Sequence, residues 1–387
     1  MPFSGSTYTN VAGATSAAAG QVVQSAVWDN IHTDLATALT QVMSQLVSEI
    51  SFRNALFYNG GLEVWQRGAG AAASIAVSAS TLLYTADRWY MQTGANQAST
   101  VAAVTGLSNG SQLAAQIQRN SGQTGVTAYG FAYALDADEI QRLRGSKVSF
   151  SSLVKAGANW SPTNGTLSCI LYLGTGAVGK RNQTPYTNET QGFNLSVNLT
   201  AGGAVTSFTG ASSAIIPVTT TQAELQFTWT PTGTAGANDF FTLDDVQLEA
   251  QLSTATWTLT NFDRLDFMTQ LQLCKRHFVK TFLYGTAPVQ NAGANTGEAV
   301  GVAGKAGAAF EFISWRFPVS MRATPTITTF NPSAANAQMR DETAAADCSA
   351  TAAAGNVTES TNATSTGNAG TVVGNVLGLH MTADAGI

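Results

Sequence analysis

A glycine-rich stretch, Gly174–Arg181, has the motif in this sequence with the clearest link to known chemistry. It reads G-T-G-A-V-G-K-R, which matches G-x-G-x-x-G and differs at one position from the phosphate-binding pattern G-x-x-x-x-G-K-[ST]. The differing residue is Arg181, which has no hydroxyl for a magnesium ion. Residues 182–185 end in Pro185 and cannot begin the helix whose N-terminus would hold a phosphate. We therefore predict a glycine-rich hairpin loop here.

Residues that bind metals or act as nucleophiles are few. Cys274 and His277 are three apart and could share a helix face. A zinc site needs about four ligands, and no second pair in the sequence has metal-ligand spacing. The chain has 3 histidines and 3 cysteines and no G-x-S-x-G elbow. The sequence therefore predicts no metal site, no cofactor and no nucleophilic catalysis.

Paired carboxylates could still hydrolyse glycans. The two candidate groups are Asp136/Asp138/Glu139 and Asp244/Asp245. We expect the first group to cap a helical turn. The second group is expected at a β-bulge, because the apolar pattern changes parity there. Carboxylates that are neighbours in a strand point to opposite faces, which is poor geometry for a catalytic pair. The sequence thus predicts that the protein is not an enzyme, with polysaccharide depolymerisation kept as an alternative.

Sugar binding needs exposed rings for stacking and amides or carboxylates for hydroxyl groups. Trp160 is the first candidate, because it lies in a loop with no core periodicity, beside Asn159. Tyr186 is the second candidate. A tryptophan buried at a trimer interface is the competing interpretation of Trp160.

The composition excludes several classes of protein. Charged residues make up 11% of the 387 residues, and the net charge is −5 with 18 basic residues. No basic run is present, so we expect no nucleic-acid binding. No apolar stretch is long enough for a membrane span, and residues 1–5 do not resemble a signal peptide. We expect the cysteines to be free and buried.

A single long helix is expected near the start of the chain. Residues 21–58 contain neither glycine nor proline, and apolar side chains recur in steps of three and four, which places one apolar stripe on a helix. The stripe consists of Trp28, Ile31, Leu35, Leu39, Val42, Leu46 and Ile50. We predict that it self-associates as a coiled coil, the alternative being a helix that lies across its own β-domain.

The remainder of the chain indicates strands and turns. Leu225, Phe227 and Trp229 share one parity, with polar residues between them, which is typical of a half-buried strand. We also expect Trp65 and Trp89 to form a packed corner with the charged residues beside them. The predicted organisation is an extended arm at 1–24, a helix at 25–57, a β-sandwich at 58–256 and a C-terminal β-domain at 257–387.

Several short blocks resemble a β-sandwich module of bacteriophage tail-fibre and other virion fibre proteins. The blocks are Asn59–Gly68, Tyr84–Trp89, Leu143–Ser151, Asp245–Glu249, Leu271–Phe278, Phe317–Pro325 and Thr382–Ala385. The chain departs from the family at 255–258, where a proline and basic residues are usual, and at His277, where an aromatic hydroxyl is common. These departures indicate that the junction between the two β-domains is built differently from that of the family.

The resemblance implies a mainly β homotrimeric fibre with two jelly-roll-like sandwiches on the outside of a virion, made in the cytoplasm of a bacterial host. It implies attachment to other virion proteins through the N-terminal arm and non-catalytic binding of host surface glycans. A tail fibre that binds a receptor is the first hypothesis. A capsid-mounted head fibre or decoration protein is the second, and a depolymerase is the third.

Overall fold

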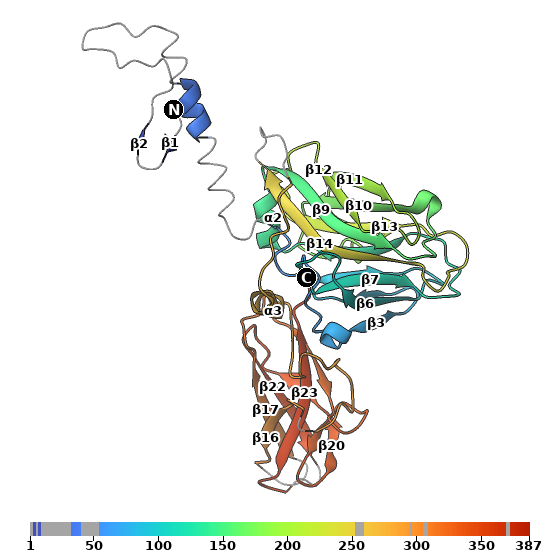
Figure 1. Ribbon diagram of the computed structural model, residues 1–387. Helices are drawn as coiled ribbons and strands as arrows, with labels where there is room; N and C mark the ends of the chain where they lie inside the picture. The colour runs from blue at the N-terminus through green and yellow to red at the C-terminus, as the bar shows by residue number, and fades with distance from the viewer. Residues whose placement is uncertain are drawn as a thin grey trace, which may run out of the picture. The chain divides into compact units, whose positions relative to one another are not determined.

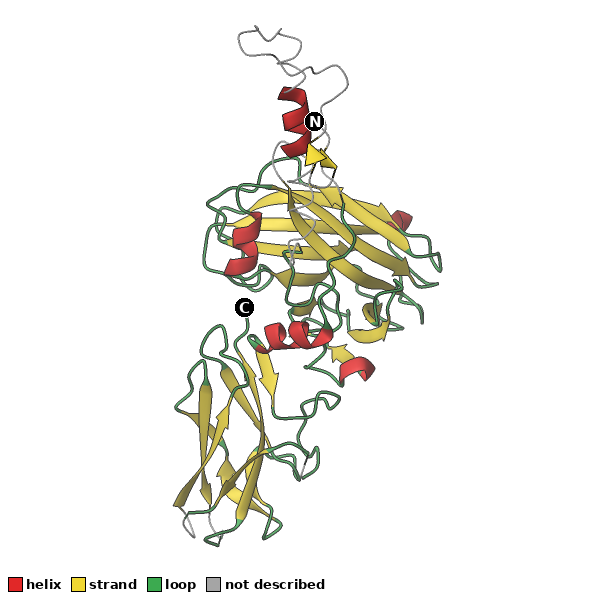
Figure 2. Ribbon diagram, turned by 60° about the vertical axis from the view of Figure 1, so that its left-hand side comes forward, coloured by secondary structure: helices red, strands yellow, loops and turns green. Residues whose placement is uncertain are grey.

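The computed structural model describes residues 3–4, 7–8, 32–39, 54–251, 259–294, 296–304, 309–368 and 372–387. The chain forms two units, Met1–Arg53 and Asn54–Ile387. In the first unit, β1 (Phe3–Ser4) pairs with β2 (Thr7–Tyr8), and residues 32–39 are helical. Figure 1 labels the elements in chain order, and Figure 2 shows that strands dominate the second unit.

The predicted apolar stripe is described only in part. Leu35 and Leu39 lie in the helical segment with 52% and 55% of their surface exposed. The other five residues of the stripe, Trp28, Ile31, Val42, Leu46 and Ile50, lie outside the described residues. The coiled coil and the trimer therefore remain predictions.

Two six-stranded antiparallel sheets form a β-sandwich in the first part of the second unit. The β10 sheet has the order β11-β10-β13-β8-β5-β4, with β4 (Leu82–Tyr84), β5 (Trp89–Gln92), β8 (Tyr129–Ala134), β10 (Thr166–Gly174), β11 (Thr190–Asn198) and β13 (Gln222–Trp229). The β9 sheet has the order β12-β9-β14-β7-β6-β3, with β3 (Ser74–Val77), β6 (Ser99–Thr105), β7 (Leu113–Arg119), β9 (Lys147–Ala156), β12 (Thr206–Ala211) and β14 (Phe240–Gln251).

Aromatic side chains fill the space between the two sheets. Phe227 of β13 lies 6.0 Å from Phe150 of β9 and 6.5 Å from Phe241 of β14, measured between ring centroids. Trp89 of β5 stacks on Phe131 at 5.1 Å. The predicted inward parity of β13 is therefore confirmed, because its aromatic positions face the opposite sheet.

Both structural predictions for the clustered carboxylates are confirmed, the helix cap at Asp136 and the β-bulge at Asp244–Asp245. Asp136 is the N-cap of α2 (Ala137–Leu143) and forms a capping box with Glu139, which satisfies two backbone N–H groups at the helix start. The register of β14 against β9 shifts between Asp244 and Gln247, and Asp245 has a φ of 48°. This is the β-bulge that the change of parity predicts.

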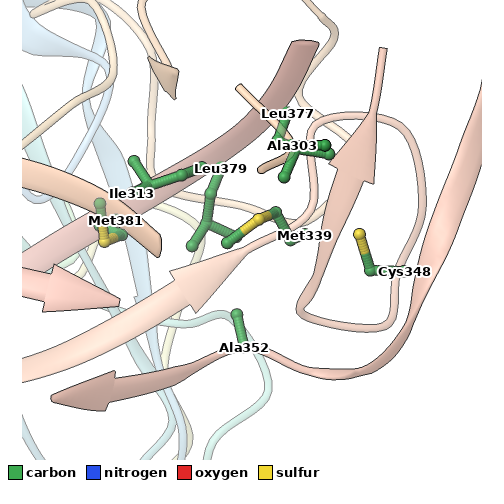
Figure 3. Packing of buried hydrophobic residues seen from close by; sticks show 8 residues of the cluster. All are labelled: Ala303, Ile313, Met339, Cys348, Ala352, Leu377, Leu379 and Met381. Carbon is green, nitrogen blue, oxygen red and sulfur yellow. The ribbon is translucent and has the colours of Figure 1, made fainter. Parts of the chain in front are cut away.

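The C-terminal part contains a short helix, a six-stranded sheet and a three-stranded sheet. The helix is α3 (Phe267–Lys275). The larger sheet contains β15 (Phe278–Lys280), β16 (Ala299–Val302), β18 (Thr326–Phe330), β19 (Gln338–Asp341), β20 (Ala346–Thr351) and β23 (Val376–Asp384). The smaller sheet contains β17 (Ala309–Arg316), β21 (Ala353–Gly355) and β22 (Thr361–Asn368). Figure 3 shows their shared core, in which Leu379 and Met381 of β23 lie near Ile313 of β17 and Leu377 lies beside Ala303.

Two arginines, Arg88 and Arg67, link the sandwich to the C-terminal part. Arg88, just before β5, donates to the carbonyl of Ala134 at 2.7 Å and pairs with Glu139 at 3.1 Å. Its other terminal nitrogen lies 3.4 Å from Nδ1 of His277, which follows α3. Arg67 pairs with Asp384 of β23 at 2.6 Å. The predicted packed corner is confirmed, and it extends into the second β-domain.

Candidate ligand-binding face

The structure buries the ring that the sequence suggested for sugar stacking. Trp160 is 7% exposed and packs edge-on against Phe241 at 5.7 Å between centroids, and its indole nitrogen donates to the carbonyl of Gly165 at 2.9 Å. The expectation of an exposed Trp160 ring is therefore wrong, because core packing reaches this loop. The exposed Asn159 accepts from the backbone of Asn238 at 3.0 Å.

Tyr186 is also covered and lies far from Trp160. It is 6% exposed, packs with Ile170 and Tyr172, and donates to the carbonyl of Gly179 at 2.8 Å. The indole of Trp160 donates to Gly165, next to the start of β10, whereas Tyr186 lies beside Gly174 at the end of this strand. The length of β10 therefore separates the two side chains. The three residues proposed from the sequence do not form one site, and whether any of them binds a glycan is untested.

The glycine-rich motif lies in a hairpin loop, as predicted. Residues 175–189 join β10 to its antiparallel neighbour β11, and no helix follows the glycines. Gln222 of β13 holds the loop by accepting from the backbone of Gly176 at 2.8 Å and donating to Ala177 at 2.7 Å. Arg181 lies over the ring of Tyr172 at 3.6 Å and pairs with Glu189 at 2.8 Å. The loop therefore covers one end of the outer face of the β10 sheet.

The remainder of that outer face has aligned polar side chains. Paired residues in antiparallel strands lie on the same face of a sheet, and the register puts one row of residues across five strands. The row is Ser196, Ser168, Thr228, Gly130 and Gln92. At about 4.8 Å between strands, this row is about 19 Å long. A row of this length and composition can form hydrogen bonds with an extended polar ligand.

The next row contributes an amide beside an apolar position. Asn194, Ile170, Gln226 and Ala132 are paired in that order across β11, β10, β13 and β8. Ile170 is 7% exposed and Gln226 is 6% exposed. Together with the row above, Gln226 and the nearby Asn182 complete a surface that we call the amide–hydroxyl face. It consists of Gln92, Ser168, Asn182, Ser196, Gln226 and Thr228.

The polar groups of this face are largely unpartnered within the described part of the chain. Only Thr228 has a protein partner, since its hydroxyl donates to the carbonyl of Tyr129 at 2.9 Å. The side-chain nitrogen of Asn182 is fully buried without a hydrogen bond. Buried polar groups normally have partners, and on this face only the nitrogen of Asn182 is described as buried without one. The other unpartnered polar groups are accessible to water or to a bound molecule.

Gly130 forms the floor of the amide–hydroxyl face. A Cβ atom at this position would lie 2.5 Å from Nε2 of Gln226 and 3.4 Å from Nδ2 of Asn182. The two amides therefore converge over a residue that has no side chain. The absence of a side chain at residue 130 lets the amide of Gln226 lie directly over the backbone there.

The charged groups beside this face lie in the loop or under it. Glu224 of β13 is buried, and its Oε2 accepts from the hydroxyl of Tyr90 and from the backbone of Arg181. Burial raises the pKa of Glu224 to about 7, against the lowering effect of these two hydrogen bonds. Burial also lowers the pKa of Lys180, whose ammonium lies 4.3 Å from the ring centre of Tyr84. The open part of the face therefore has no charge of its own.

The carboxylates considered for catalysis are engaged in structural hydrogen bonds. Asp244 accepts from the backbone of Leu107 at 2.7 Å and from Ser111 at 3.0 Å, and Asp245 accepts from Ser108 at 2.8 Å. Burial and the neighbouring Asp245 raise the pKa of Asp244 to about 7. Asp136 of the other group accepts from Arg322 at 3.1 Å, and Glu139 pairs with Arg88.

The residues considered for a metal site have other roles. Cys274 is buried, and its thiol donates to the carbonyl of Tyr58 at 2.6 Å. Burial lowers the pKa of His277 well below its ordinary value, with a further contribution from Arg88. Within the described ranges, no group of three or more histidine, cysteine or acidic side chains could hold a metal ion. A search of the same residues finds no helix long and apolar enough to cross a membrane.

A depression of about 540 Å³ lies beside α3. Its lining includes Met268, Leu273, Val319 and Arg276. Arg276 already donates to the hydroxyl of Tyr58 at 2.9 Å. The lining also contains Thr269, Gln272 and Ser320, but the amide–hydroxyl face is the better candidate for a sugar, because its polar row extends across five strands.

Comparisons with known proteins find structural likeness only. No protein-family model matches the chain, and no curated protein matches it. A bacteriophage CBA120 tailspike protein 4 domain is 11% identical with a TM-score of 0.31, and the match covers 52% of this chain and 22% of that one. A family 11 carbohydrate-binding module from Clostridium thermocellum, in complex with a mixed-linked tetrasaccharide, is 13% identical with a TM-score of 0.28, covering 47% and 99%.

A Stig cyclase from Fischerella sp. TAU is similar to the same degree, at 13% identity and a TM-score of 0.30, covering 50% of this chain and 96% of that one. The three proteins differ in what they do. Identities and TM-scores this low select no function, so function must be argued from the residues of the site.

Proposed function

We propose that this protein is a non-catalytic glycan-binding fibre of a bacteriophage virion, with the amide–hydroxyl face as its sugar site. The observation that carries the proposal is that Ser196, Ser168 and Gln92 lie in one row across the outer face of the β10 sheet and Gln226 lies in the next row. None of these four side chains has a hydrogen-bond partner within the described ranges. Sugar hydroxyls both donate and accept hydrogen bonds, and amides and hydroxyls match them in both roles. The virion role is supported by the sequence blocks that resemble fibre proteins.

Hydrogen bonding, rather than ring stacking, would dominate recognition on this face. Tyr172 is 9% exposed under Arg181, and Tyr186 is 6% exposed. With no open ring to stack on a sugar, each site would bind weakly. Three copies on one fibre would compensate through avidity, because the second and third binding events become intramolecular.

The proposal predicts that Gln226→Ala weakens binding about tenfold, the effect of losing roughly 1.4 kcal/mol of hydrogen bonding. The probe is an array of purified bacterial surface polysaccharides, followed by titration of any polysaccharide that binds. Gln116→Ala is the matched control, because Gln116 lies half-buried on β7 of the β9 sheet. Equal affinities of the two variants would overturn the assignment of the site.

Gly130→Ala provides a second check, because its Cβ atom would lie 2.5 Å from Nε2 of Gln226 and would displace that amide. We expect weaker binding with the midpoint of thermal unfolding little changed, because only the flexible end of the Gln226 side chain has to move. Failure of the wild-type protein to bind any polysaccharide or to compete with phage adsorption would contradict the function itself. Shortening of a polysaccharide during incubation, abolished by Asp→Asn changes, would instead establish the depolymerase alternative.

The part of the virion to which the protein is attached distinguishes a tail fibre from a capsid-mounted head fibre or decoration protein. We propose that the arm at 1–24 docks on a tail protein, with a capsid protein as the alternative. Labelling of intact virions with an antibody against the sandwich, viewed by electron microscopy, locates the fibre on the tail or the head. Virions without the protein would overturn both placements.

A further inference from the structure

The segment that follows β23 passes from the C-terminal part to the sandwich. Asp384, the last residue of β23, pairs with Arg67 of the sandwich at 2.6 Å. The backbone N–H of Ala385 then donates to the carbonyl of His277 at 2.8 Å, and that of Gly386 donates to the Asp384 carboxylate at 2.8 Å. These contacts fix the path of the backbone over residues 384–386.

The next residue, Ile387, packs on the outer face of the β10 sheet. It lies against a buried cluster that consists of Tyr90 of β5 and Ala132 and Ala134 of β8. The register pairs Ala132 with Gln226, a member of the amide–hydroxyl face. Because paired residues lie on the same side of a sheet, Ile387 and the amide–hydroxyl face share one surface.

Two residues of β4 complete the surface around Ile387. Leu82 and Tyr84 pack against the same cluster, and Tyr84 is paired with Tyr90. The two tyrosine rings meet edge to face, with their centres 6.1 Å apart. Burial raises the pKa of the Tyr84 hydroxyl, and the Ile387 backbone is among the neighbouring groups that lower it. We call this surface the tyrosine floor, and it consists of Leu82, Tyr84, Tyr90, Ala132 and Ala134.

The tyrosine floor directly adjoins the amide–hydroxyl face. Ala132 is the neighbour of Gln226 across the strands, and Gln92 follows Tyr90 by two residues on the same side of β5. Residues two apart on a strand are separated by about 7 Å, and neighbouring strands by about 4.8 Å. A glycan bound along the polar row therefore meets the tyrosine floor within about the length of one sugar unit.

The tyrosine floor supplies the aromatic rings that the polar row lacks, and sugar rings stack on aromatic rings. The rings are covered from two parts of the chain, by Lys180 of the loop and by Ile387. Lys180 is a flexible side chain that can itself donate to sugar hydroxyls. Tyr90 keeps its position without Ile387, because its hydroxyl donates to the buried Glu224. Ile387 is only partly buried, so a ligand that covers the same rings can replace it.

We infer that Ile387 occupies a sugar-stacking subsite on the tyrosine floor and that a bound glycan displaces it; this inference rests on the proposed function. The ligand class is an extended glycan with at least one sugar ring beyond those that the polar row binds. A residue of the chain in the subsite lowers the apparent affinity in proportion to the fraction of molecules in which the subsite is free. With about one molecule in ten free, removal of the Ile387 side chain raises the affinity about tenfold.

Titration of the full-length Ile387→Gly variant with the polysaccharide found on the array tests the inference. We expect about tenfold tighter binding than that of the wild type, because glycine leaves the subsite free. Ile215→Gly is the matched control, since Ile215 lies in the sandwich and is 46% exposed, and its affinity should equal that of the wild type. Adding Tyr84→Ala to Ile387→Gly should remove the gain, because the sugar then loses one of its stacking rings.

Nuclear magnetic resonance of methyl-labelled protein gives a second readout. The methyl groups of Ile387 lie against tyrosine rings, whose ring currents shift the methyl signals. The signal that is missing from the spectrum of Ile387→Gly belongs to Ile387. Saturating polysaccharide should move this signal to the position of an exposed isoleucine, and an unchanged signal at saturation would overturn the displacement.

The outcomes separate this inference from the proposed function. Equal or weaker binding by Ile387→Gly, with a wild type that binds, would overturn the subsite and leave the amide–hydroxyl face as the sugar site. A gain that persists after Tyr84→Ala would also overturn the subsite, since the ring would then play no part. Absence of binding by both the wild type and Ile387→Gly would overturn the inference and the proposed function together.

Discussion

Replacing Arg88 with methionine should lower the free energy of unfolding by about 3–5 kcal/mol, the usual cost of breaking a buried ion pair at one partner. The Arg88 and Glu139 side chains are 1% and 0% exposed. The substitution leaves Glu139 without its cation and the carbonyl of Ala134 without the donor at 2.7 Å. It also removes a guanidinium that lies 4.9 Å from the ring centre of Tyr133.

Chemical denaturation at a fixed protein concentration measures this effect, since the stability of an oligomer depends on concentration. Arg181→Met is the matched control, because the Arg181–Glu189 pair is 26% and 30% exposed and exposed pairs contribute at most about 1 kcal/mol. The double variant Arg88→Met/Glu139→Gln should recover part of the loss by removing the stranded charge. A loss for Arg88→Met no larger than that for Arg181→Met would contradict the buried junction.

The second large effect concerns pH. Glu224→Gln should stabilise the protein relative to wild type at pH 8, and this advantage should shrink by roughly 3 kcal/mol between pH 8 and pH 4. The pKa of Glu224 is about 7 in the folded protein against an ordinary value of 4.5, and each pH unit of difference corresponds to about 1.4 kcal/mol. Its Oε1 is buried without a hydrogen-bond partner, so the ionised form is poorly satisfied.

The sign follows from proton binding. Between pH 7 and pH 4.5 the folded protein binds a proton at Glu224 that the unfolded chain does not, so wild-type stability rises as the pH falls through this window. Glutamine cannot take up that proton, so the variant lacks this rise. Comparing the two proteins by denaturation at each pH cancels the contribution of other groups, including Glu139, whose pKa burial raises to about 7. Parallel stability curves for the two proteins would rule out a buried, ionisable Glu224.

Local patterns in the sequence were sufficient to predict structural features that depend only on neighbouring residues along the chain. The parity of Leu225, Phe227 and Trp229 predicted the inward face of β13, and the change of parity at Asp244–Asp245 predicted the bulge. The spacing of Asp136 and Glu139 led to the helix cap. Arg181 in place of a hydroxyl residue excluded a phosphate loop. Each of these conclusions rests on backbone geometry over a few residues.

The candidate site required the tertiary structure. Trp160 looked exposed because its loop has no periodicity, yet Phe241, 81 residues later, buries its ring. The polar parity of Gln226 and Thr228 was visible in the sequence, but it could not show that Thr228 aligns with Ser168 and Gln92 and that Gln226 lies in the next row. That alignment depends on strand order and register between segments far apart in the chain.

By itself, the sequence therefore determined that the chain is mainly β, poor in charge and without a recognisable catalytic motif, since composition and short-range alternation encode these properties. Only the tertiary structure decided which side chains lie on the outer face of the β10 sheet and that Ile387 packs against them. The physical reason is that pairing between distant strands sets the side chains that share a surface, and the amino-acid pattern of one strand does not specify its neighbours.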